Sequence, residues 1–155
     1  MELRRAALDD AKGIGRIMKE SYRIDTIAEA ESVFIDEMEK FHHYVVATMG
    51  YDIMAFASWS VRDLPKHELV EMNRIAVHKE HRHKGIGGNL FYYMVQEAKR
   101  YYSEQGLKLR KVFCAVHASD EKATAFCESL GFKLEATLKD HYHQGEDESI
   151  YSMFF

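Results

Sequence analysis

Cysteine, proline and long apolar runs are scarce in this chain of 155 residues. It contains two cysteines, which form no CxxC pair, and one proline, so nothing indicates a disulfide framework or a cysteine-based metal site. No stretch approaches the ~20 apolar residues that a membrane-spanning helix needs, and no apolar signal core follows the N-terminus. We therefore expect a cytoplasmic protein with reduced thiols that does not enter a membrane.

An excess of positive charge is also missing, because 25 Asp and Glu residues outnumber 21 Lys and Arg residues and give a net charge of -4. A general nucleic-acid binder needs a clustered cationic face, so nucleic acid is not expected as a partner. Apolar residues make up 46% of the chain, enough to build a sizeable core. The length and composition predict a single domain over residues 1–155.

Apolar patterning predicts an α/β (α+β) fold with about seven strands and about four helices. Helices and strands alternate through the middle of the chain and the ends supply hairpins, which indicates a mixed, mostly antiparallel sheet flanked by helices. The strands are expected over residues 2–6, 44–49, 53–59, 69–77, 112–116, 132–138 and 150–155, and the helical stripes over 14–22, 30–41, 90–102 and 123–130.

A glycine-rich run, Arg82-His83-Lys84-Gly85-Ile86-Gly87-Gly88, lies between a predicted strand and the third predicted helix. Backbone amides at a helix start attract anions, and glycine lets a ligand approach closely, so a diphosphate is the expected occupant. The run lacks the Ser or Thr of a Walker loop, and Leu90 stands where a dinucleotide fingerprint has its third glycine. Taken alone, such a turn is as often only a tight connection.

Together with Arg74-Ile75-Ala76-Val77 before it, this run resembles motif A of the GNAT superfamily of N-acetyltransferases. Ala123, Phe126 and Leu130-Gly131-Phe132 resemble the later signature of the same superfamily. The segment from Glu71 to Ile75 is similar to the PaiA-like polyamine acetyltransferases. The resemblance extends along practically all of the chain.

The resemblance implies an N-acetyltransferase that moves an acetyl group directly from acetyl-CoA to a primary amine. The acceptor would be a small polyamine-like molecule, a protein N-terminus or a lysine; the alternative is a non-catalytic acyl-CoA-binding regulatory module. Backbone groups of Ile75 and Val77 would pair with pantetheine, and Asp120 stands where the superfamily usually has Asn. The implied cofactor-binding residues are Ile75, Ala76, Val77, Arg82, His83, Lys84, Gly85, Ile86, Gly87, Gly88, Asp120 and Phe126.

Candidate catalytic residues follow from the proton transfers that amide formation requires. Glu71 is the expected base; the rival interpretation is a surface or salt-bridged glutamate, paired for example with Arg74. Cys127 stands where the superfamily often places its acid, a Tyr. If Cys127 is inert, the alternatives are His117 or Tyr142 as the acid, or departure of the thiolate directly into solvent.

The remaining polar clusters receive simpler interpretations. The nine histidines have no acidic or cysteine partner at a recognised ligand spacing, so no metal is expected. Residues 146–148, Glu-Asp-Glu, are expected to form a solvated turn that could attract a cationic amine. Tyr22 and Trp59 could line an acceptor cleft, although aromatic residues beside a sheet are more often core. The oligomeric state stays open, a homodimer included.

Overall fold

The computed structural model describes residues 1–155 and contains seven strands and four α-helices. The strands form one sheet in the order β1-β2-β3-β4-β5-β7-β6. The pairs β1–β2, β2–β3, β5–β7 and β6–β7 are antiparallel, whereas β4 pairs with β5 in parallel, which confirms the predicted fold class. In chain order the elements are β1 (Glu2–Arg5), α1 (Ala11–Ser21), α2 (Ile27–Glu39), β2 (His43–Met49), β3 (Asp52–Val61), β4 (Leu69–Val77), α3 (Ile86–Ser103), β5 (Lys111–His117), α4 (Glu121–Ser129), β6 (Lys133–His143) and β7 (Glu146–Phe154).

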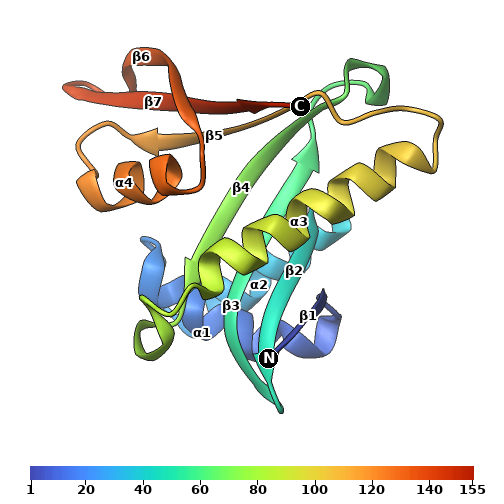
Figure 1. Ribbon diagram of the computed structural model, residues 1–155. Helices are drawn as coiled ribbons and strands as arrows, with labels where there is room; N and C mark the ends of the chain where they lie inside the picture. Colours follow the sequence, from blue (N-terminus) through green and yellow to red (C-terminus); the bar gives the residue numbers. More distant parts are fainter. The chain divides into compact units, whose positions relative to one another are not determined.

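The chain divides into two compact units, and β4 and α3 contribute to both of them. Unit one comprises Met1–Ser60 and Arg74–Ala98, and unit two comprises Val61–Asn73 and Lys99–Phe155. Within unit one, α1 and α2 lie on one face of β2 and β3, and α3 lies on the opposite face (Figure 1).

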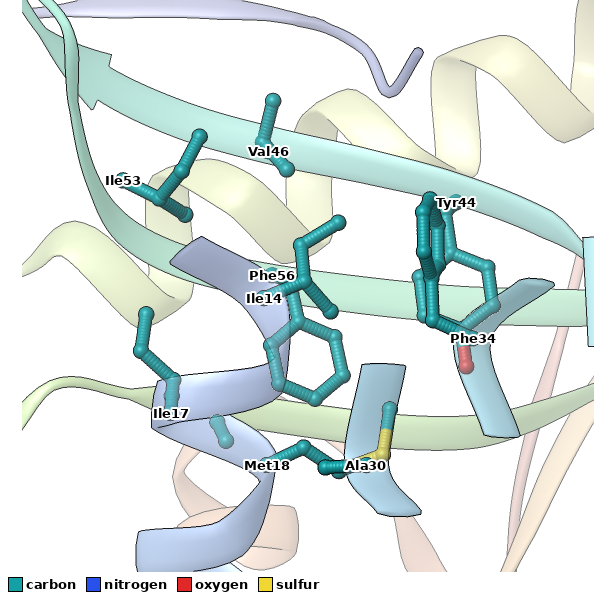
Figure 2. Close-up of a cluster of buried hydrophobic side chains, with 10 residues drawn as sticks. Ile14, Ile17, Met18, Ala30, Phe34, Tyr44, Val46, Ile53 and Phe56 are labelled. Atoms are coloured by element: carbon teal, nitrogen blue, oxygen red, sulfur yellow. The ribbon is translucent and has the colours of Figure 1, made fainter. Parts of the chain in front are cut away.

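The core of unit one is formed by the apolar stripes of α1 and α2 packed against β2 and β3 (Figure 2). Ile14, Ile17 and Met18 recur at helical spacing and are fully buried, as the sequence predicts. Phe34 of α2 meets the Tyr44 ring edge-on, with 4.8 Å between the ring centroids. Apolar residues three or four positions apart therefore fix which face of each helix meets the sheet.

The close packing of α1 against α2 explains the glycine at position 15. A Cβ at this position would lie 2.8 Å from Glu31 Cγ and 3.3 Å from the carbonyl oxygen of Ile27, both of which belong to α2. These distances are too short for a real side chain, so the glycine permits the close approach of the two helices.

Unit two contains the antiparallel strands β5, β7 and β6, and α4 contacts β5. Two sequence predictions for this region are wrong in their boundaries. The sixth strand continues to His143, and the seventh begins at Glu146, so the acidic run is part of a strand and the turn is confined to residues 144–145. Ser149 pairs with Val116 in this ladder, and Glu148 is buried, which a solvated turn would not allow.

Replacing Phe34 by Ala is expected to destabilise the protein by about 3–5 kcal/mol, because the change leaves a cavity in the core of unit one. Urea unfolding followed by circular dichroism measures the free energy of unfolding. Ile35→Ala is the matched control: its side chain follows on the same helix but is 37% exposed, so the loss should be well under half as large. Equal losses for the two variants would contradict this account of the core.

Candidate functional site

The glycine-rich run forms a tight loop between the end of β4 and the start of α3. His83 and Gly85 both adopt left-handed backbone conformations, with φ values of 61° and 79°. The first helical hydrogen bond runs from Asn89 N to Gly85 O at 3.1 Å, so the N–H groups of residues 86–88 have no acceptor within the helix. A Cβ on Gly85 or Gly88 would meet no atom within 4 Å. The start of α3 therefore offers backbone N–H donors that lack helical acceptors, beside two glycine positions with free space around them.

Two cationic side chains brace this loop. Arg82 Nε donates a 2.9 Å hydrogen bond to the carbonyl oxygen of Val77, at the end of β4, and Lys84 Nζ donates to Glu80 O at 3.3 Å. Arg82 also lies 3.9 Å from the Glu20 carboxylate. Both side chains remain exposed and add positive charge close to the start of α3. An anion placed there would meet donors and charge together.

The backbone of Ile75 in β4 is held by a side chain. Its N–H donates to the Tyr22 hydroxyl at 3.0 Å, and the same hydroxyl donates to its carbonyl oxygen at 3.2 Å. The family resemblance implies that backbone groups of Ile75 and Val77 pair with a ligand. The side chain of Ala76, between them, is buried. Tyr22 and Arg82 thus occupy the polar groups that a ligand pairing with this strand would need.

Tyr22 is itself fixed by a network that sequence reasoning did not find. The Arg74 guanidinium lies 5.0 Å from the centre of the Tyr22 ring, and its Nη2 donates to Glu37 Oε1 at 2.9 Å. Tyr44 donates a hydrogen bond to the same carboxylate. Burial lowers the pKa of Arg74, but the hydrogen bond and charge of Glu37 outweigh it, so the pKa is raised and the ion pair is kept.

Glu71, the predicted base, belongs to unit two and is partly exposed. Its carboxylate lies 3.5 Å from Arg62, so the partner suggested from the sequence, Arg74, is wrong: Arg74 binds Glu37 instead. In β4 the side chains of Val70 and Met72 are buried, and Glu71 lies between them on the more open face of the strand.

The two cysteines of unit two are in contact. Cys114 on β5 and Cys127 on α4 are free and buried, with 3.6 Å between their sulfur atoms. The hydrogen bond with Cys127, together with burial and the nearby charge of Glu71, raises the pKa of Cys114. The same hydrogen bond lowers the pKa of Cys127 against the opposing effect of burial. The predicted acid therefore has a sulfur partner that the sequence did not indicate.

The other predicted residues of α4 have structural contacts. Asp120 caps the helix: its Oδ1 accepts a 3.0 Å hydrogen bond from Ala123 N. The side chain of Phe126 is half-buried, and its carbonyl oxygen accepts a 2.6 Å bond from Ser129 Oγ.

His117 and Tyr142 lie near each other in unit two, with their rings edge-on and 6.5 Å between the centroids. His117 Nδ1 is 2.9 Å from Glu148 Oε2, and the Glu148 side chain is only 6% exposed. Sequence reasoning missed Glu148 because it assigned residues 146–148 to a turn. Glu148 and Ser149 are both buried, so no alternation of buried and exposed residues marks this part of the strand.

In unit one, the structure brings together the loop and the end of β4, and in unit two it brings together Cys114 with Cys127 and His117 with Tyr142. No group of three or more His, Cys, Asp or Glu residues is placed to hold a metal ion. None of the helices has the length and apolar character needed to cross a membrane.

Comparison with known proteins agrees with this fold. The model of the acetyltransferase (GNAT) family matches residues 11–132. No curated protein sequence matches the chain. A solved structure of a GNAT-family protein from Desulfovibrio desulfuricans is 26% identical, with a TM-score of 0.81, over 99% of this chain and 98% of that one.

Two more distant structures share the fold. A Salmonella typhimurium protein solved with acetyl-CoA is 17% identical, with a TM-score of 0.73, over 99% of this chain and 92% of its own. A variant of the spermidine N-acetyltransferase of Vibrio cholerae is 17% identical, with a TM-score of 0.76, over 99% and 95% of the two chains.

Proposed function

Because the chain belongs to the acetyltransferase (GNAT) family and is an N-acetyltransferase, we propose that it transfers the acetyl group of acetyl-CoA directly to a primary amine. Residues 1–155 would act as a single N-acetyltransferase domain. The observation that carries the proposal is the start of α3, where the N–H groups of residues 86–88 have no helical acceptor and the space beside Gly85 and Gly88 is free.

The diphosphate of acetyl-CoA fits the donors at this helix start. Its negative charge would meet the backbone N–H groups of residues 82–88, the positive end of the α3 dipole, and the side chains of Arg82 and Lys84. Gly85 supports the fit, since its left-handed backbone turns the loop and a side chain would fill the space in front of it. In the bound state the acetyl-CoA supplies an activated thioester, and the chain positions it.

Ile75 and Val77 would pair with the pantetheine arm through their backbone groups. For this to happen the Tyr22 hydroxyl must leave the N–H and C=O of Ile75, and Arg82 must release the carbonyl of Val77. Each exchange replaces one hydrogen bond by another, so the net free-energy cost is small. It is about 1 kcal/mol for each new hydrogen bond that has poorer geometry than the old one. Arg82 would then turn its guanidinium to the diphosphate.

Glu71 is the proposed base, and it removes a proton from the acceptor ammonium through water. Its contact with Arg62, at 3.5 Å, is long and solvent-exposed on the Arg62 side, so the carboxylate is not locked in a tight ion pair. Backbone N–H groups of β4 would polarise the thioester oxygen.

His117 is the proposed acid that protonates the departing thiolate. Glu148 holds its Nδ1, so the Nε2 can carry the proton that is donated. Tyr142, which is 64% exposed, is the second candidate. Cys127 is the third, and its burial against Cys114 favours a packing contact over proton donation.

A cationic acceptor, either a polyamine-like molecule or a peptide amine, is supported by charge. The chain carries a net charge of -4, and Asp36 and Glu39 of α2 are exposed. Glu37 does not contribute, because Arg74 neutralises it. A structure with the same fold is named as a spermidine N-acetyltransferase.

The proposal is tested by mixing the protein with acetyl-CoA and a panel of primary amines, namely spermidine, a lysine peptide and an alanine-terminated peptide. Release of the CoA thiol, dependent on one of these amines, is the expected result. Binding of acetyl-CoA without thiol release for any amine would overturn the proposed reaction and restore the interpretation as an acyl-CoA-binding module.

Gly88→Glu is expected to weaken CoA binding by more than about tenfold, because a carboxylate would occupy the diphosphate position. The fold should persist, since a Cβ at Gly88 meets no atom within 4 Å and an acidic residue suits the first turn of a helix. Calorimetric titration gives the affinity and thermal melting checks the fold. Ser103→Glu, at the other end of α3, is the control of equal charge; unchanged affinity in Gly88→Glu would remove the diphosphate from this loop.

Glu71→Gln is expected to lower turnover at neutral pH by about 100-fold or more, because the amide cannot accept the ammonium proton. The affinity for CoA should change little. Steady-state kinetics with the best amine measures the first quantity and titration the second. The exposed Glu146→Gln is the matched control; equal rates for both variants would exclude Glu71 as the base.

Tyr22→Phe is expected to tighten CoA binding by about 2–10-fold, because the hydroxyl no longer competes for the backbone of Ile75. The ring and its contact with Arg74 are retained in this variant. Tyr51→Phe, at a fully exposed position, is the control. Weaker CoA binding in Tyr22→Phe would mean that the hydroxyl assists the ligand rather than competing with it.

A further inference from the structure

The only two cysteines of the chain are neighbours in space. Cys114 lies in β5 and Cys127 in α4, and their sulfur atoms are 3.6 Å apart. A disulfide needs about 2.0 Å between the sulfurs, so side-chain rotation and a small shift of α4 would close the remaining distance. The two thiols are not part of any group of three or more His, Cys, Asp or Glu residues that could hold a metal ion.

Helix α4 buries little of its surface, so a shift of this helix costs little free energy. Cys127 is the only fully buried residue of the helix, and Cys114 is the residue that it meets on β5. The helix has nine residues, most of them wholly or partly exposed. An element with so little buried apolar area opens locally more readily than the core of a domain. Opening of α4 would expose both thiols to small oxidants.

The two thiols differ in their readiness to react. The hydrogen bond between them lowers the pKa of Cys127 and raises that of Cys114, with burial and the charge of Glu71 adding to the rise at Cys114. The thiolate, which is the reactive form of cysteine, therefore forms first at Cys127. Cys114 is then placed as the second thiol, which resolves the oxidised product.

We propose that Cys114 and Cys127 form a redox-active dithiol, which a hydroperoxide converts to an intramolecular disulfide that ties α4 to β5. In the first step the Cys127 thiolate attacks one peroxide oxygen; the O–O bond breaks, and water or an alcohol leaves after taking up a proton. In the second step Cys114 attacks the sulfenic sulfur, the S–O bond breaks, and water leaves with the remaining protons. One hydroperoxide is reduced and two thiols are oxidised, so atoms and electrons balance.

The disulfide would act on the chain by restricting α4. The cross-link joins residues 114 and 127 and removes the opening motion that a thiol contact allows. The helix contains Phe126 and is capped by Asp120, and both residues are expected to contact the coenzyme. Formation of the disulfide does not depend on the proposed acetyl transfer, so each can fail without the other.

The first experiment treats the full-length, reduced protein with a small excess of hydrogen peroxide. We expect intact-mass measurement to show the loss of two hydrogen atoms, and thiol titration after denaturation to fall from two thiols per chain to none. A reducing agent should restore both. Retention of both thiols, an intermolecular disulfide, or addition of oxygen without cross-linking would each overturn the proposal.

Cys114→Ser supplies the matched control. This variant keeps Cys127 but has no resolving thiol, so peroxide should add oxygen to it instead of removing two hydrogens. Thermal melting checks that it folds; if it does not, reversal of the wild-type mass change by the reducing agent still decides the question. Loss of two hydrogens within a folded Cys114→Ser monomer would contradict the assigned pair.

Hydrogen exchange tests the restriction of α4. In the oxidised protein the amides of residues 121–129 are expected to exchange at least about tenfold more slowly than in the reduced protein. The amides of α1 provide the internal reference and should exchange at the same rate in both states. Equal exchange of α4 in the two states would refute the tie between α4 and β5.

Discussion

Unit one is organised around the backbone of Ile75, whose N–H and C=O both need a partner. Buried main-chain polar groups are rarely left unpaired, and here a tyrosine hydroxyl satisfies both groups at once. Because Tyr22 follows α1, this contact ties the end of that helix to β4. Arg74 and Glu37 extend the tie to α2, so strand and helices share one polar network beside the apolar core.

The backbone of Ile75 is also where the pantetheine arm is proposed to bind. A strand whose polar groups are held by side chains can exchange those side chains for a ligand that offers equivalent donors and acceptors. Val77 is held in the same way. Its carbonyl oxygen accepts a hydrogen bond from Arg82, the residue proposed to contact the diphosphate. Under the proposed function, acetyl-CoA would supply both an amide-bearing arm for the strand and an anionic diphosphate for the loop.

In unit two, two side chains that the proposals use lie on β5. Cys114 lies within this strand and His117 at its end, and each has a partner from another element, Cys127 and Glu148. The partner of His117 is a nearly buried carboxylate, which fixes the imidazole through one nitrogen. The partner of Cys114 is a second thiol, so this pair is the one for which disulfide formation is proposed.

Local chemistry made much of the protein predictable from its sequence. The amphipathic stripes specify α1 and α2, the hydroxyl of Thr26 caps α2, and the glycine-rich run precedes a helix. These features depend on residues within a few positions of one another, so periodicity and turn preferences are sufficient. The partners Glu37 of Arg74, Arg62 of Glu71 and Glu148 of His117 are farther away in the chain.

These pairs form only after the strands have paired in register and each helix has packed its apolar face against the sheet. A charged residue has many candidates of opposite sign in the sequence, and pairing depends on distances of a few ångström that local patterns do not encode. By itself the sequence determined most of the elements, the glycine-rich loop before α3 and the family resemblance. Tertiary structure decided that Tyr22 holds Ile75 and that Cys127 meets Cys114, because such contacts arise only after the apolar stripes have been buried.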